Sequence, residues 1–105
     1  MPHYLQQVAY SQEGWEALVA NPQNRIEAVR PAIEKLGGKI EAAWFSFGDY
    51  DVVVIVDLPD NVSAAALSFA VSSTGLVRTK TIPLLTVAEA DEAIGKAVSY
   101  RGPGA

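Results

Sequence analysis

Hydrophobic and polar positions along this chain change their spacing several times, and these changes predict an alternation of strands and helices. The segment His3–Tyr10 is rich in tyrosine, leucine and valine and predicts a first strand. The next segment, Ser11–Ala20, has apolar residues at helical spacing but contains Gly14, so it is either a short helix or a packed loop.

The following segment carries the start and stop signals of a helix. Asn21 is a favourable N-cap, and Pro22 suits a first helical position. Gly37 and Gly38 supply the left-handed residue that ends a helix. The apolar stripe consists of Ile26, Val29, Ile33 and Leu36. Pro31 conflicts with this pattern, because a proline inside a helix removes a backbone hydrogen bond and is expected to kink or split it.

Two further strands, Lys39–Phe47 and Tyr50–Leu58, are separated by Gly48 and Asp49, which predicts a hairpin with a two-residue turn. Such a turn divides the side chains of the pair between two faces. One face carries Phe47, Phe45, Ala43, Tyr50, Val52 and Val54. The opposite face carries Ser46, Trp44, Ala42, Asp51, Val53 and Ile55.

The second half of the chain predicts helix, strand and helix. After a break at residues 59–61, the expected apolar stripe of a helix is Val62, Ala65, Ala66, Phe69 and Ala70. A fourth strand, Leu76–Leu85, contains Pro83, which places the end of that strand at a sheet edge or bulge. Thr86 and Glu89 form a capping box for a last helix. The apolar residues of that helix are Ala90, Ile94, Ala97 and Val98.

This order of elements predicts an α+β fold of the ferredoxin-like βαββαβ type, with a four-stranded antiparallel sheet and an added C-terminal helix. Right-handed crossovers place both main helices on one face of the sheet. The other face, with Trp44, Val53 and Ile55, is also apolar and needs a cover. Either the last helix or a second copy of the chain covers it. We favour a second copy, which makes a dimeric α/β barrel with any pocket inside.

Composition limits the possible functions. The chain has 105 residues, no cysteine, one histidine and a net charge of −4. This length predicts one domain over residues 1–100 with a flexible tail at 101–105. The excess of acidic over basic residues disfavours nucleic-acid binding, which needs a basic surface. With no long apolar run and no leader-like start, we expect a cytoplasmic protein with no membrane contact. Neither a metal site nor a cofactor is predicted, because the sequence lacks thiolate ligands, a phosphate loop and a dinucleotide fingerprint.

The run Gly48-Asp49-Tyr50-Asp51, followed by the apolar strand Val52–Leu58 and Pro59-Asp60, resembles the signature of the GYD-domain family. Further similar segments are Tyr10–Gly14 (with Ser11 where threonine is usual), Leu36–Lys39, Ala64–Leu67 and Gly75–Thr81. The resemblance covers roughly positions 3 to 90. It implies a relative of the dimeric α/β barrel proteins and leaves the chemistry open. Cofactor-free monooxygenases, haem proteins and isomerases occur in that wider superfamily, which is an analogy of fold only.

Two residues are candidates for catalysis. Asp51 should lie at the rim of the apolar face, where a raised pKa would suit a general base. Its alternative role is structural, either capping the turn or pairing with Arg78. His3 is a candidate proton carrier because histidine titrates near neutrality, although a lone histidine near a chain end is more often a surface residue.

The candidate ligand-binding residues are Trp44, Ser46, Val53, Ile55 and Arg78. Arg78 and Lys80 share one face of the fourth strand and could anchor an anion, or serve only to block unwanted edge pairing. Tyr50 is expected on the helix side as a core residue.

These features support three hypotheses. The first is a homodimeric small-molecule binding or sensing protein that takes a hydrophobic or weakly anionic ligand in the barrel. The second is a cofactor-free enzyme for proton transfer or oxygenation of an apolar substrate. The third is a structural or assembly protein with a filled barrel. We favour the first.

Overall fold

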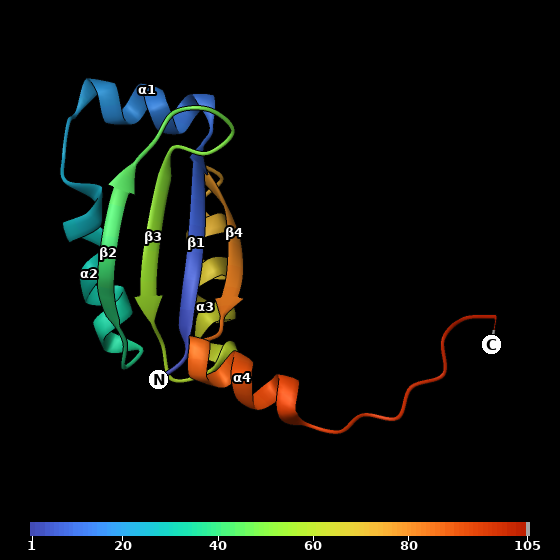
Figure 1. The fold of residues 1–105 in the computed structure, drawn as a ribbon. Coiled ribbons are helices and arrows are strands. Elements are labelled where there is room, and N and C mark those ends of the chain that lie inside the picture. Colours follow the sequence, from blue (N-terminus) through green and yellow to red (C-terminus); the bar gives the residue numbers. More distant parts are fainter. Residues whose placement is uncertain (105) are drawn as a thin grey trace.

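A computed structural model describes residues 1–104 of the chain (Figure 1). The elements are β1 (His3–Tyr10), α1 (Gln12–Ala20), α2 (Arg25–Lys35), β2 (Lys39–Phe45), β3 (Val52–Asp57), α3 (Asn61–Ser72), β4 (Val77–Leu84) and α4 (Val87–Gly95). Within these residues, no helix has both the length and the apolar character needed to span a bilayer.

The four strands form one antiparallel sheet in the order β2-β3-β1-β4, which confirms the ferredoxin-like α+β fold. Helices α2 and α3 lie behind the sheet in Figure 1 and leave its front face open. The ambiguous segment after β1 is a helix, α1, which is capped by the Ser11 side chain accepting a hydrogen bond from the Gly14 N–H at 3.1 Å.

The core lies between the sheet and the two rear helices. Alternate residues of β1 and β3 point into it, as the strand period requires. The buried cluster consists of Tyr4, Ile33, Val52, Val54, Val56, Leu58, Ala64 and Leu67. The assignment of Val52 and Val54 to the helix side is therefore confirmed.

Helix α2 begins later than the sequence predicts. Its N-cap is Asn24, whose side chain accepts a hydrogen bond from the Glu27 N–H, whereas Asn21 caps the C-terminus of α1. The expected start at Asn21 and Pro22 was wrong because both asparagines satisfy the same capping chemistry. Of the two alternatives at Pro31, a kink or a split, the split is wrong, because the helix runs continuously through Pro31. Ile33, two residues later, packs fully into the core.

The hairpin keeps its predicted register but not its tight turn. Phe45 pairs with Val52 as expected, yet the strands end there and residues 46–51 form a wider loop. Gly48 has a φ of 139°, which suits its place in the loop. Tyr50 is not a core residue: the Arg78 guanidinium lies 5.2 Å from the centre of its ring.

Helix α3 is rotated relative to the prediction. The residues that face the core are Ala64 and Leu67, while Val62 and Phe69 of the expected stripe are 78% and 73% exposed. Two apolar stripes run along this helix, so spacing alone could not decide which one is buried.

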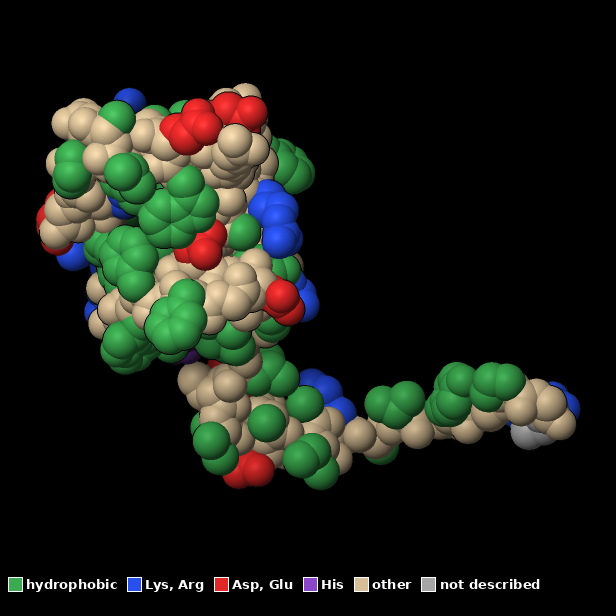
Figure 2. All heavy atoms as spheres, turned by 90° about the horizontal axis from the view of Figure 1, so that it is seen from above, with side chains coloured by type: hydrophobic (Ala, Val, Ile, Leu, Met, Phe, Trp, Pro, Cys, Tyr) green, Lys and Arg blue, Asp and Glu red, His purple; other side chains and the backbone are tan. Residues whose placement is uncertain are grey.

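Helix α4 has its predicted capping box but ends at Gly95, before Ala97 and Val98. None of its residues is buried, and the segment after it extends away from the body of the molecule (Figures 1 and 2). Helix α4 therefore does not cover the open face of the sheet.

Candidate functional site

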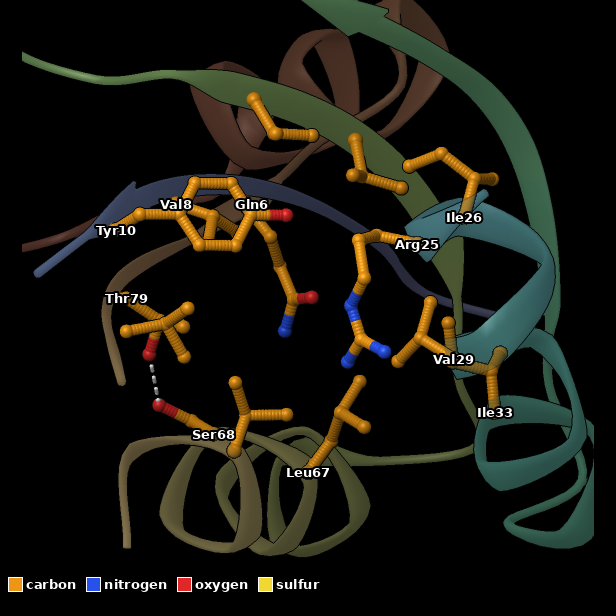
Figure 3. A pocket seen from close by; sticks show the side chains of 14 residues that line it. Gln6, Val8, Tyr10, Arg25, Ile26, Val29, Ile33, Leu67, Ser68 and Thr79 are labelled. Atoms are coloured by element: carbon orange, nitrogen blue, oxygen red, sulfur yellow. Dashed lines mark hydrogen bonds between the residues drawn. The ribbon is translucent and has the colours of Figure 1, made fainter. Parts of the chain in front are cut away.

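A cavity of about 90 Å³ lies between the two rear helices and the sheet (Figure 3). Helix α2 packs on β2 and α3 packs on β4, so the central strands between them form the floor of a cleft. The cavity is lined by Gln6, Val8, Tyr10, Arg25, Ile26, Val29, Ile33, Val52, Val54, Leu67, Ser68, Val71, Val77 and Thr79. Most of these side chains are aliphatic, so polar groups among them stand out.

Gln6 is the most unusual of these polar residues. It belongs to β1, is only 6% exposed, and its Nε2 has no hydrogen-bond partner among the described residues. Its amide extends into the cavity beside the Arg25 side chain (Figure 3). A buried amide without a partner costs free energy, which makes it an unusual choice for a purely structural position.

Arg25 stands at the first residue of α2 and reaches the same cavity from the opposite wall (Figure 3). It donates a hydrogen bond to Gln23 Oε1 at 2.8 Å, and no carboxylate of residues 1–104 forms a salt bridge with it. Burial raises the pKa of the Tyr10 phenol, and the neighbouring Arg25 guanidinium partly offsets that rise. The cavity therefore has one positively charged, polar end.

The residues predicted to form a pocket lie on the other face of the sheet. Trp44 pairs with Val53, and Ile55 pairs with Ala42, on the open side. Trp44 is 60% exposed, whereas Val53 and Ile55 are half-buried. Within one subunit these side chains form an apolar surface rather than an enclosed pocket.

Asp51 and Ser46 are both held by backbone groups near the hairpin loop. Asp51 Oδ2 accepts a hydrogen bond from the Tyr10 N–H at 2.9 Å, and the Asp51 N–H donates to the Val8 carbonyl at 2.8 Å. The Ser46 hydroxyl donates to the Tyr50 carbonyl at 2.8 Å. Asp51 thus extends the pairing with β1 by one residue before the first residue of β3.

We expect Asp51→Ala to lower the free energy of unfolding by about 2 kcal/mol, because it removes a charged acceptor from a backbone N–H. Asp51→Asn keeps an acceptor oxygen and should cost less than half as much. Urea unfolding of the two variants measures the difference. If both variants lost the same free energy of unfolding, the side-chain oxygen that accepts from the Tyr10 N–H would not be the source of the stability.

Arg78 and Lys80 share one face of β4, as predicted, and that face is the open one, because both residues alternate with the core-facing positions Val77 and Thr79. The Arg78 guanidinium donates to the Asp49 carbonyl at 3.4 Å in addition to its contact with Tyr50. The alternative pairing with Asp51 is not formed, since that carboxylate bonds to β1 instead.

His3 belongs to a cluster that sequence reasoning found only in part. Its Nδ1 lies 2.5 Å from Asp57 Oδ1 and 3.2 Å from Glu41 Oε2. Lys39 Nζ lies 3.8 Å from the other Asp57 oxygen. Histidine and two carboxylates can ligate a metal ion, but here the imidazole and the lysine ammonium already lie against the carboxylates.

Comparison with known proteins identifies the family. The GYD domain family model matches residues 4–94, which is most of the chain. The chain belongs to the GYD-domain family. A similar relative is the "Glutamine synthetase and cystathionine beta-lyase binding protein" of Thermus thermophilus, which is 31% identical over 90 residues, 85% of this chain and 94% of the relative. No solved structure matches.

Two groups of residues in this GYD domain were missed by sequence reasoning. Gln6 and Arg25 meet only because β1 and the start of α2 converge in space. Glu41 reaches His3 at a bulge, where the ladder shifts register between Ile40 and Ala42. A glutamine at a core-facing position of an apolar strand was the one signal available in the sequence.

Proposed function

We propose that this GYD-domain protein is a homodimeric binding protein in the cytoplasm, and that the open face of its sheet packs against the same face of a second copy. The supporting observation is that face itself. It carries Leu5, Val53, Ile55, Ile82 and the exposed Trp44, and no described segment of the chain covers it. Burying such a surface is favourable at about 25 cal/mol per Å².

The charges on the open face suit a two-fold arrangement. Glu41 lies on the edge strand β2, near the start of β1, while Arg78 lies on the opposite edge strand β4, near the end of β1. In an isologous interface each contact between two different residues occurs twice, once in each direction across the two-fold axis. A two-fold axis can therefore bring the acidic corner of one copy to the basic corner of the other.

The similar protein from Thermus thermophilus supports a role for this chain in binding other proteins. That relative is named for binding glutamine synthetase and cystathionine beta-lyase. Face-to-face pairing of the sheets leaves apolar residues on the outer side of α3, where Val62 and Phe69 are exposed. We assign this outer surface to the recognition of a metabolic enzyme. Association of two copies would also enclose the space beside Trp44, Val53 and Ile55, with Ser46, Asp51 and Arg78 near its rim.

The proposal is tested in two steps with the purified full chain. Sedimentation velocity at micromolar concentration should show a dimer. Biolayer interferometry against purified glutamine synthetase and against purified cystathionine beta-lyase from the same organism should then show saturable binding to at least one of them. Phe69→Asp should abolish that binding while the variant stays dimeric. A monomer at all accessible concentrations would overturn the homodimer, and no binding to either named type of enzyme would overturn the partner assignment.

A further inference from the structure

We propose that the cleft between α2 and α3 is a binding site for a small aliphatic carboxylate, with Arg25 and Gln6 holding the carboxylate group. The cleft is formed within one subunit, on the side of the sheet away from the proposed dimer face. The inference therefore does not depend on the dimer or on a protein partner.

The size and walls of the cavity define the apolar part of the ligand. A dry cavity of about 150 Å³ is known to hold a benzene molecule, so the volume of about 90 Å³ here suits a chain of about three or four carbons. The walls beside it are formed by Val29, Val54 and Leu67 among other aliphatic side chains. Toward Arg25 the cavity adjoins a second hollow of about 330 Å³ under α1, which leaves room for a polar end group.

The polar groups define the other end of the ligand. Gln6 Nε2 is a buried donor with no hydrogen-bond partner in residues 1–104, and it extends into the cavity next to the Arg25 guanidinium (Figure 3). A carboxylate can accept from an amide N–H and from a guanidinium at once, because it has two oxygens with about four acceptor sites. Ser68 and Thr79 are already occupied by their mutual hydrogen bond of 2.6 Å and contribute little.

The charge of the lining excludes other small ligands. None of the described residues around the cavity is acidic, whereas Arg25 carries a positive charge that no described carboxylate neutralises. A free amino acid or an amine would bring an ammonium group that finds no carboxylate here. A phosphate would leave most of the aliphatic wall unfilled. A monocarboxylate with a short hydrocarbon chain matches both ends of the cavity.

An explanation without a ligand has to account for Thr81 as well. Thr81 lies opposite Gln6 in the β1–β4 ladder, and its Oγ1 is also buried without a partner. If the only role of the Gln6 amide were to form a hydrogen bond with Thr81, then Thr81→Val would leave the amide without that partner and would lower the free energy of unfolding. If Gln6 serves a ligand, Thr81→Val leaves carboxylate binding unchanged.

Butyrate titrated into the ¹⁵N-labelled full chain, followed by NMR, tests the site directly. We expect a dissociation constant of about 1 mM, as suits so small a ligand, with shifts confined to the Gln6 amide and to backbone groups of β1 and the start of α2. Arg25→Gln should weaken binding at least tenfold. Arg30→Gln removes the same charge from the same helix, at a residue paired with Glu27 outside the cavity, and should leave binding unchanged.

Gln6→Leu gives a second readout that a structural role would not produce. It should abolish the butyrate shifts and raise the midpoint of thermal unfolding by about 4 °C, because an unpaired buried amide is replaced by an apolar group of similar size. The proposal is overturned if Gln6→Leu destabilises the fold, if butyrate moves no cleft resonance, or if Arg25→Gln and Arg30→Gln weaken binding equally.

Discussion

Trp44→Asp is expected to convert the proposed homodimer into monomers without unfolding them. The indole is 60% exposed in the single subunit, so the fold does not depend on it. In the dimer the same side chain would be desolvated against the partner, where aromatic residues carry much of the binding energy. A carboxylate placed there also loses its hydration. We expect the dimer to be weakened by about 3 kcal/mol, which is roughly a hundredfold in the dissociation constant.

Sedimentation velocity over a range of concentrations measures this change, and circular dichroism checks that the variant stays folded. Phe69→Asp is the matched control, because it places the same charge at an aromatic position that is also mostly exposed, on the outer side of α3. It should leave the dimer intact. If Phe69→Asp dissociates the dimer and Trp44→Asp does not, then copies associate through the helices and the barrel arrangement is wrong.

Gly38→Ala is expected to lower the free energy of unfolding by about 3 kcal/mol. A Cβ at this position would overlap the Asp57 carbonyl oxygen and would lie 2.7 Å from Leu58 Cδ2. The carbonyl belongs to the backbone at the end of β3, and Leu58 is fully buried, so neither neighbour can yield cheaply. This close approach of two backbones gives a physical reason for the second glycine of the Leu36–Lys39 segment.

Urea unfolding of Gly38→Ala and Gly95→Ala measures the effect against a matched control. Gly95 is the last residue of α4, has open space around its Cβ position and has no positive φ, so alanine there should leave stability unchanged or raise it by up to about 1 kcal/mol. If Gly38→Ala were as stable as Gly95→Ala, the start of β2 could move away from β3 at little cost.

Local patterns predicted most of the secondary structure correctly. The hairpin register of Phe45 with Val52 followed from strand alternation and a glycine-containing turn. The capping box of Thr86 and Glu89 followed from spacing alone, because its two hydrogen bonds join residues within one helical turn. Errors arose where the sequence offered two equivalent signals, as with the asparagine caps before α2 and the two apolar stripes of α3.

The sequence by itself determined the order of the elements, the ferredoxin-like topology and the apolar character of both sheet faces, since these depend on residue spacing and on turn chemistry. Only the tertiary structure decided where a site can form. Gln6 and Arg25 lie on different elements and meet because α2 packs on β2 and α3 packs on β4, so that a cavity remains between the two helices above the central strands. A bulge in β2 likewise brings Glu41 to His3 and Asp57. Contacts of this kind depend on how the helices rotate and pack on the sheet. That arrangement is set by the close packing of all core side chains together, and residue spacing within one segment does not determine it.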